Sequence, residues 1–170
     1  MHYDADEFYP TPPDLVADML VGVNLDSIST ILEPSAGKGD IIKYIQHRKD
    51  KYSRRTLDID SIEISPELRH ILKGEELRVV HDDFLTYDTF KRYEFVIMNP
   101  PFSNGDKHLL HALRFVMGGG KLVCVLNAET IRKPYTKSGS ERVRPLDELN
   151  RVRDYRQDAF ASAENKSDVE

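Results

Sequence analysis

The sequence predicts an α/β fold, in which an open, doubly wound and mostly parallel β-sheet is flanked by helices. Two observations predict it. Short, continuous apolar segments alternate along the chain with segments whose apolar residues recur at helical spacing, the pattern of strands covered on both faces by crossover helices. The chain has 170 residues, of which 39% are hydrophobic and 31% charged, as is typical of one soluble globular domain. We therefore expect a single domain over residues 1–170.

Five strands are predicted from their apolar runs, at Ile28–Leu32, Ile59–Ile64, Leu77–Val80, Tyr93–Met98 and Leu122–Leu126. Right-handed crossovers place the carboxyl ends of parallel strands along one edge of the sheet, where ligands bind in folds of this kind. The residues that directly follow each strand are therefore the candidates for chemistry.

Helices are predicted between and after these strands. Thr11 is expected to cap a first helix that has a proline at its first position and ends near Gly22, and Ser65-Pro66 starts a helix that Gly74 stops. Further helices are expected at Asp40–Arg48, Lys107–Met117 and Pro145–Asp158. The triplet Gly118-Gly119-Gly120 is expected to separate a helix from the last strand, and a long polar stretch covers Asn127–Arg144.

Charge and cysteine content narrow the function classes. The single cysteine, Cys124, excludes an internal disulfide framework and a cysteine-built zinc site, and no other metal site is predicted. The amino-terminal segment lacks a signal-peptide pattern and no apolar run is long enough to span a membrane, so a cytoplasmic, reduced protein is expected. The net charge of −5 argues mildly against nucleic acid, but Lys38–Arg55 and Arg132–Arg156 are basic stretches that offer phosphate contacts.

A glycine-rich turn, Glu33–Asp40, follows the first predicted strand. Gly37 and Gly39 allow a tight turn and close approach of the backbone to a ligand. The dinucleotide fingerprint needs a third glycine where Ile42 stands, and the carboxylate of Glu33 would repel phosphate. The turn therefore suits a ligand that carries positive charge.

Acids follow the next two strands. Glu63 follows the second strand, where an acid can accept both hydroxyl groups of a ribose. Asp82, Asp83 and Phe84 follow the third strand. An acid there suits an adenine amino group with the Phe84 ring against the base, although a helix cap explains the same residues.

The most specific motif follows the fourth strand, where Asn99-Pro100-Pro101-Phe102 forms a stiff loop that is rich in hydrogen-bond acceptors. The Asn99 side-chain oxygen and the Pro100 carbonyl can each accept one hydrogen of an exocyclic amine, which frees the nitrogen lone pair for attack. The Phe102 ring can stack on a base. The motif therefore indicates a planar substrate with an amino group.

The order of these four motifs resembles class I S-adenosylmethionine-dependent methyltransferases, and more narrowly those that modify adenine N6 in DNA. Phe8–Pro12, ahead of the glycine-rich turn, is similar to the branch whose cofactor motifs precede the catalytic motif. The stretch Asn99–Asp106, followed by His108, is similar to small methyltransferases of phages and mobile elements. The resemblance covers roughly residues 8–130 and implies a Rossmann-like sheet, S-adenosylmethionine as cofactor and DNA as partner.

The resemblance also implies a role for each motif residue. Thr11 would contact the methionine carboxylate of the cofactor, and Glu63, Ile64, Asp83 and Phe84 would hold its ribose and adenine. The methionine end would be lined by Glu33, Ser35, Ala36, Gly37 and Gly39. The target base would be held by Asn99, Pro100, Pro101 and Phe102.

Two departures from that family keep alternatives open. The family sheet has seven strands whereas five are predicted here, so either the chain is truncated or the missing strands are supplied otherwise. No target-recognition domain is seen, so sequence reading would come from Asn127–Arg144, the basic stretches or a separate specificity subunit. An RNA methyltransferase acting on guanine N2 or adenine N6, a protein-glutamine methyltransferase and a non-catalytic cofactor-binding remnant are the alternatives.

Three remaining residues are expected to serve the fold. His108 and His111 fall on a predicted helix, where surface or capping roles are expected, and Cys124 is expected to be inert core.

Overall fold

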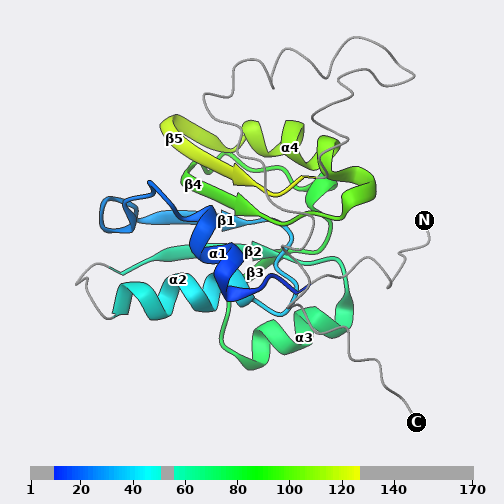
Figure 1. Cartoon of the computed structure of the whole chain (residues 1–170). Helices are drawn as coiled ribbons and strands as arrows, with labels where there is room; N and C mark the ends of the chain where they lie inside the picture. The colour runs from blue at the N-terminus through cyan, green and yellow to red at the C-terminus, as the bar shows by residue number, and fades with distance from the viewer. Residues whose placement is uncertain (1–9, 51–55, 127–170) are drawn as a thin grey trace.

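A single parallel sheet forms the centre of the molecule (Figure 1). The structure, a computed structural model, describes residues 10–50 and 56–126, and within them the sheet has five strands in the order β3-β2-β1-β4-β5, with every pairing parallel. The strands are β1 (Thr30–Glu33), β2 (Asp58–Ile62), β3 (Val79–His81), β4 (Tyr93–Met98) and β5 (Val116–Cys124). This arrangement confirms the predicted α/β, doubly wound class.

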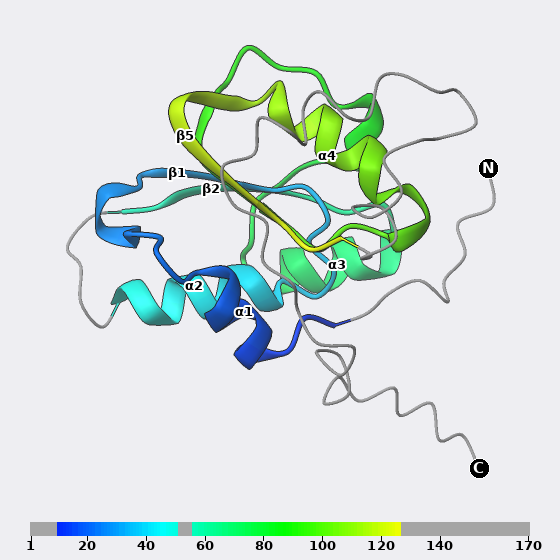
Figure 2. The same cartoon turned by 45° about the horizontal axis from the view of Figure 1, so that its top comes forward.

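Helices cover both faces of the sheet, with α1, α2 and α3 on one side and α4 on the other (Figure 2). The α-helices are α1 (Pro13–Met19), α2 (Asp40–Asp50), α3 (Pro66–Gly74) and α4 (Gly105–Leu113). The short 3₁₀ helices are η2 (Leu25–Ser27), η3 (Phe84–Thr86) and η4 (Phe102–Asn104). The expected helix Pro145–Asp158 and the polar stretch Asn127–Arg144 lie outside the described residues.

The core sits on both faces of the central strands. Phe95 and Ile97 of β4 pack with α1 and α2, whereas Val96 and Met98 pack with α4 and Phe115. Successive side chains of a strand point to opposite faces, so a strand covered on both sides is apolar throughout, as predicted for Tyr93–Met98. Fully burying one such side chain stabilises the fold by about 1.5–3 kcal/mol.

The start of α1 differs from the expectation. Pro12, not Thr11, is the N-cap, and no side chain caps this helix end. The Thr11 hydroxyl instead accepts a hydrogen bond from the Asn99 side chain at 3.2 Å. The local pattern predicts that the Thr11 hydroxyl caps α1, but in the structure this hydroxyl contacts Asn99, directly after β4. Ser65, by contrast, caps α3 as predicted, because its hydroxyl accepts the Leu68 N–H at 3.3 Å.

The glycine triplet belongs to a strand, which corrects the predicted boundary. The α4 helix ends at Leu113, and β5 begins at Val116 and contains all three glycines. In the β4–β5 register, Tyr93 pairs with Val116 but Phe95 pairs with Lys121, so β5 bulges between these pairs. A Cβ on Gly120 would lie 3.0 Å from the Glu94 carbonyl oxygen, and Gly119 has a φ of 80°. Glycine is therefore what lets the strand bulge past its neighbour.

Within the part of the chain that the structure describes, no helix has the length and apolar character needed to cross a lipid bilayer.

Candidate functional site

The glycine-rich turn after β1 is fastened to the end of β2. The Ala36 N–H donates to the Ile62 carbonyl at 3.0 Å, and the Gly37 N–H donates to Glu63 Oε2 at 2.7 Å. Gly37 and Gly39 have φ values of 56° and 82°, in the left-handed region that favours glycine. A Cβ on Gly39 would lie 2.6 Å from Leu77 Cδ1. The turn is thus held close to its neighbours in a conformation that its two glycines permit.

Glu33 is a buried acid with an unmatched oxygen at this turn. Its side chain is 1% exposed, and its Oε2 atom has no hydrogen-bond partner among the described residues. Burial raises the pKa of this carboxyl well above its usual value, and the nearby Asp40 and Glu63 raise it further. The buried Ser35 hydroxyl oxygen beside it also lacks a partner. Two unmatched buried polar atoms in an acidic setting fit a ligand group that donates hydrogen bonds and carries positive charge.

Glu63 links the turn to the start of α3. Its Oε2 atom accepts the Gly37 N–H, and its Oε1 atom accepts the Ser65 N–H at 2.8 Å. Burial raises its pKa, while these two backbone donors oppose the rise. Each carboxylate oxygen has a second lone pair, so the predicted ribose contact is compatible with both bonds. The next side chain, Ile64, is 43% exposed, as an apolar surface for a base would be.

The acid after β3 sits at a cap, and its neighbouring ring is in the core. Asp83 Oδ1 accepts the Leu85 N–H at 2.9 Å and caps η3, which is the alternative considered for this residue. The Phe84 ring is 3% exposed and lies 4.9 Å from the His111 ring and 5.9 Å from the Phe115 ring, between centroids. Packing accounts for Phe84, so the structure does not place its ring on an adenine surface.

The Asn99–Phe102 loop meets the entry to α1. Asn99 Nδ2 donates to the Thr11 hydroxyl, a contact between residues 88 apart in sequence. The Thr11 N–H in turn donates to the Asp40 carboxyl. Pro100 is buried, and Phe102 packs, half-buried, against the core cluster of α1 and α2. Thr11 therefore joins the two halves of the site, the glycine-rich turn and the Asn99 loop.

The histidines of α4 serve the core more than the surface. His108 is 8% exposed, its Nδ1 atom lies 3.0 Å from the Asn104 carbonyl oxygen, and burial lowers its pKa. His111 Nε2 lies 3.0 Å from the Tyr87 carbonyl oxygen. The expected surface role is thus wrong for His108. Cys124 is partly exposed, but its thiol is desolvated and its pKa is raised, in keeping with an inert group.

In the described part of the basic stretch Lys38–Arg55, which excludes residues 51–55, only some of the cations are available to phosphates. Lys49 is 4% exposed and its Nζ atom donates to the Ile28 carbonyl at 2.7 Å, while Lys43 pairs with Glu75 at 3.2 Å. Lys38 and Arg48 are exposed. The second stretch, Arg132–Arg156, lies outside the described residues. Lys49 is therefore a structural residue rather than a phosphate contact.

Asp40 is the site residue that sequence reasoning overlooked. It is predicted as the last residue of the turn Glu33–Asp40 and the start of a helix, with no role of its own, yet its carboxyl accepts the Thr11 N–H and acts electrostatically on Glu33. Burial raises its pKa, whereas Lys43 and Lys38 lower it. Its position immediately after Gly39 is the sequence feature that indicates a role, since an acid within a ligand-binding turn lies close to the ligand.

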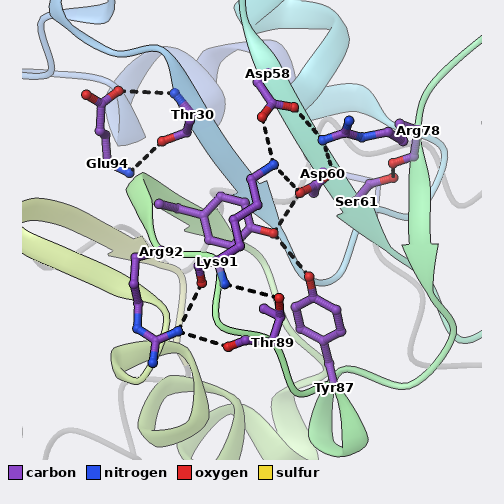
Figure 3. Close-up of polar contacts among 11 residues, drawn as sticks. Thr30, Asp58, Asp60, Ser61, Arg78, Tyr87, Thr89, Lys91, Arg92 and Glu94 are labelled. Atoms are coloured by element: carbon purple, nitrogen blue, oxygen red, sulfur yellow. Dashed lines mark hydrogen bonds and ion pairs between the residues drawn. The ribbon is translucent and has the colours of Figure 1, made fainter.

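A second group of charged side chains lies near the starts of β2, β3 and β4 (Figure 3). Asp60 is 2% exposed, and its Oδ2 atom accepts hydrogen bonds from Lys91 Nζ and the Tyr93 hydroxyl, each at 2.7 Å. Arg78 bridges Asp60 and Asp58. Arg78 and Lys91 form ion pairs with the acids here, so we assign this group a role in the stability of the fold.

Comparisons with known proteins identify the family of the chain. The sequence matches the family described as "Methyltransferase small domain" over residues 12–155. It is 30% identical over 95 residues to the tRNA1(Val) (adenine(37)-N6)-methyltransferase of Aliivibrio fischeri strain MJ11, which covers 51% of this chain and 38% of that protein. It is 32% identical over 84 residues to the Type II methyltransferase M.CvrRI of Paramecium bursaria Chlorella virus XZ-6E, covering 47% of this chain and 21% of that protein. The chain thus spans less than half the length of these relatives.

Solved structures share the fold. A provisionally assigned RNA methyltransferase from Pyrococcus horikoshii matches with a TM-score of 0.59 and 20% identity, over 75% of this chain and 66% of that one. The glycopeptide N-methyltransferase MtfA, complexed with S-adenosyl-L-methionine, matches with a TM-score of 0.54 and 13% identity, over 69% of this chain and 55% of that one.

Proposed function

The chain belongs to the methyltransferase small domain family, and we propose that it transfers a methyl group from S-adenosylmethionine to N6 of adenine in DNA. The observation that carries this proposal is the joining of two motifs through Thr11. The loop Asn99–Phe102, which suits an exocyclic amine, lies one hydrogen bond from the residue that also contacts the glycine-rich turn. The proposed subsites for the methyl donor and for the methyl acceptor therefore both lie at the carboxyl ends of the strands.

The residues at the turn fit the cofactor. S-adenosylmethionine is bound in the glycopeptide methyltransferase of the same fold, and it carries an ammonium group and a sulfonium but no phosphate. The unmatched oxygens of Glu33 and Ser35 suit the ammonium group. Glu63 would hold the ribose hydroxyls, with Ile64 against the adenine and Asp83 on its amino group, while Ala36, Gly37 and Gly39 would line the methionine end.

The protein contributes position and electrostatics rather than strong base chemistry. When bound, S-adenosylmethionine supplies an electrophilic methyl group. The bond to Thr11 holds the Asn99 amide with its nitrogen directed at the hydroxyl, which makes Oδ1 the atom that accepts from the target amine. The Pro100 carbonyl would accept the second amine hydrogen, and Phe102 would stack on the base. A base in duplex DNA must be flipped out to reach this loop.

A second candidate substrate is RNA. The relative from Aliivibrio fischeri is named for adenine N6 in tRNA, and the viral relative is named as a Type II methyltransferase. The same Asn-Pro-Pro-Phe loop would serve an adenine in either polymer. If DNA is the substrate, recognition of its sequence would come from residues outside this loop or from a separate specificity subunit.

The test is transfer of a radiolabelled methyl group, run in parallel on unmethylated DNA, tRNA, ribosomal RNA and protein. Label in DNA that co-migrates with N6-methyladenine after digestion is the expected result. Label confined to tRNA or ribosomal RNA would move the proposal to the RNA candidate, and label in glutamine would overturn the nucleic-acid assignment. Cofactor binding without transfer to any substrate would support the non-catalytic alternative.

Asn99→Ala is expected to abolish transfer while leaving cofactor binding within about twofold, since its side chain is assigned to the target amine. Single-turnover rates and equilibrium dialysis of labelled cofactor measure the two effects. Asn24→Ala is the matched control, because that amide caps η2 through the Asp26 N–H at 3.2 Å and belongs to no proposed subsite. Retained turnover in Asn99→Ala would contradict the assigned mechanism.

A further inference from the structure

Three carboxylates, from three different elements, surround the glycine-rich turn. Glu33 ends β1, Asp40 begins α2 and Glu63 follows β2. Glu33 is 1% exposed and Glu63 is 5% exposed. The Oε2 atom of Glu33 is buried and without a partner among the described residues, as is the hydroxyl oxygen of Ser35. An acid cluster with an unmatched buried oxygen is a site that is built for a cation.

The cations near this cluster act on Asp40 and Glu63, and none of them is among the charges that act on Glu33 within the described residues. Lys43 pairs with Glu75 at 3.2 Å. The Arg69 guanidinium donates to the carbonyl oxygens of Glu63 and Ile64, at 2.8 and 2.6 Å. Lys38 and Lys43 act on Asp40, whereas the charged groups of the described residues that act on Glu33 are the acids Asp40 and Glu63. A single backbone donor, the Ile42 N–H, favours the ionised form of Glu33.

We propose that Glu33 holds a proton in the ligand-free protein and releases it when the ammonium group of the cofactor binds, so that cofactor binding is coupled to proton release. This inference rests on the proposed function, because it takes S-adenosylmethionine as the ligand. The physical reason is that a buried carboxylate beside two other acids has no counter-charge until the ligand brings one. The ammonium group and the Glu33 carboxylate then form a buried pair, with the Ser35 hydroxyl as a further acceptor.

The sign of the coupling follows from this exchange. Burial and the neighbouring acids raise the pKa of Glu33 in the ligand-free protein, and the bound cation lowers it. Between these two pKa values, binding displaces a proton, so the affinity for the cofactor rises with pH by up to about tenfold per pH unit. Above the pKa of the ligand-free protein the affinity becomes independent of this group.

Isothermal titration calorimetry with S-adenosylhomocysteine, which keeps the ammonium group and the adenosine, tests the coupling without any turnover. The titration is repeated in buffers of different ionisation enthalpy, from about pH 5.5 to about pH 7.5, below the range in which the ligand's amino group titrates. The slope of binding enthalpy against buffer enthalpy counts the protons released. A release that approaches one proton per ligand is expected at some pH in this range.

Two controls separate Glu33 from other titrating groups. 5′-Methylthioadenosine lacks the methionine end with its ammonium group, so it should bind with no proton release. Glu33→Gln should lose the release and bind S-adenosylhomocysteine at least tenfold more weakly. Asp40→Asn removes a neighbouring negative charge, so it should keep the release but move it to lower pH.

The outcomes are distinguishable. Binding of S-adenosylhomocysteine with the same enthalpy in every buffer at every pH would overturn the coupling and leave the proposed function standing, as would an unchanged proton release in Glu33→Gln. Failure of both S-adenosylmethionine and S-adenosylhomocysteine to bind the folded protein would overturn the proposed function, and the coupling with it.

Discussion

At the scale of single residues, buried acids occur within the sheet and at the carboxyl ends of its strands, and they differ in the cations and hydrogen-bond donors that contact them. Asp60, in the middle of β2, contacts Lys91, Arg78 and the Tyr93 hydroxyl. Glu33 Oε2, at the carboxyl end of β1, has no hydrogen-bond partner among the described residues; Asp60 Oδ1 also has no hydrogen bond there, but it forms an ion pair with Arg78. A buried charge with complete partners contributes to the fold, whereas a buried acid without them indicates a place for a ligand.

Asp60→Ala should lower the free energy of unfolding by about 3 kcal/mol, because it leaves Lys91 and the buried Tyr93 hydroxyl without their shared acceptor. Urea denaturation followed by circular dichroism measures the loss. Asp58→Ala is the matched control: this acid contacts the same two cations but its side chain is 47% exposed, so a loss below about 1 kcal/mol is expected. Equal losses in the two variants would contradict the structural role given to Asp60.

Gly39→Ala should destabilise the domain by about 2 kcal/mol, since Gly39 has a φ of 82° and a new Cβ would lie 2.6 Å from Leu77 and 3.0 Å from Leu72. Cofactor binding should weaken as the turn shifts. Gly74→Ala is the control, because no atom lies within 4 Å of its added Cβ and alanine is favoured over glycine in a helix by about 1 kcal/mol. Thermal unfolding curves of both variants would show opposite shifts.

At the scale of elements, each end of α2 interacts with a residue at one end of β1, the strand that it follows. Its first turn carries Asp40 at the site, and its last turn carries Lys49, whose Nζ atom donates to the Ile28 carbonyl just ahead of β1. Basic residues in the last turn also suit the negative end of the helix dipole. The helix therefore runs from the carboxyl end of β1, where the candidate site lies, to its amino end. The run of basic residues predicts phosphate contacts and gives no sign of this structural role of Lys49.

Lys49→Met keeps most of the aliphatic chain but removes the donor, so the Ile28 carbonyl loses its partner and the domain should lose about 1–2 kcal/mol of stability. Arg48→Met, at the exposed neighbouring position, should change stability by less than about 0.5 kcal/mol. Chemical denaturation of the pair checks this. If Lys49 were instead a phosphate contact, its substitution would weaken nucleic-acid binding without changing the denaturation midpoint.

At the scale of the whole molecule, three acids lie near the carboxyl ends of β1 and β2 and at the start of α2. Glu33, Asp40 and Glu63 all have raised pKa values, whose largest cause is burial. Asp58, at the start of β2, has a lowered pKa because Lys91 and Arg78 favour its charged form. The two groups therefore respond to pH in opposite directions.

The stability of the ligand-free protein should fall as pH rises from about 4.5 through the raised pKa of Glu33. A group whose pKa is higher in the folded state contributes stability that is complete below its unfolded-state pKa and is lost above its folded-state pKa. Below pH 3.8 the loss of the Asp58 contribution acts in the opposite sense. Thermal unfolding across the pH range measures this profile. In Glu33→Gln, the fall in stability as the pH rises toward neutral should be smaller. An unchanged profile in that variant would show that Glu33 does not set it.

Much of the fold and the order of the site motifs could be predicted from sequence, because these are local properties. Strand and helix periods depend on neighbouring residues, and the run Tyr93–Met98 was predicted with the bounds the structure gives. The five-stranded parallel sheet is confirmed, and S-adenosylmethionine as cofactor is supported by the family and by relatives of the same fold. The roles of single site residues stay predictions.

The contacts that distinguish the site were decided by tertiary structure. The hydrogen bond between Thr11 and Asn99, the core position of Phe84 and the buried contact of Lys49 each join residues that are distant in sequence. No local pattern specifies such pairings. Local sequence is enough to predict the sheet and the residue types at the carboxyl ends of its strands, since hydrophobic period and turn chemistry are encoded within a few residues. Which of those polar groups have hydrogen-bond partners, and which atoms, like Glu33 Oε2, have none among the described residues, depends on tertiary structure, because folding sets which groups lie side by side.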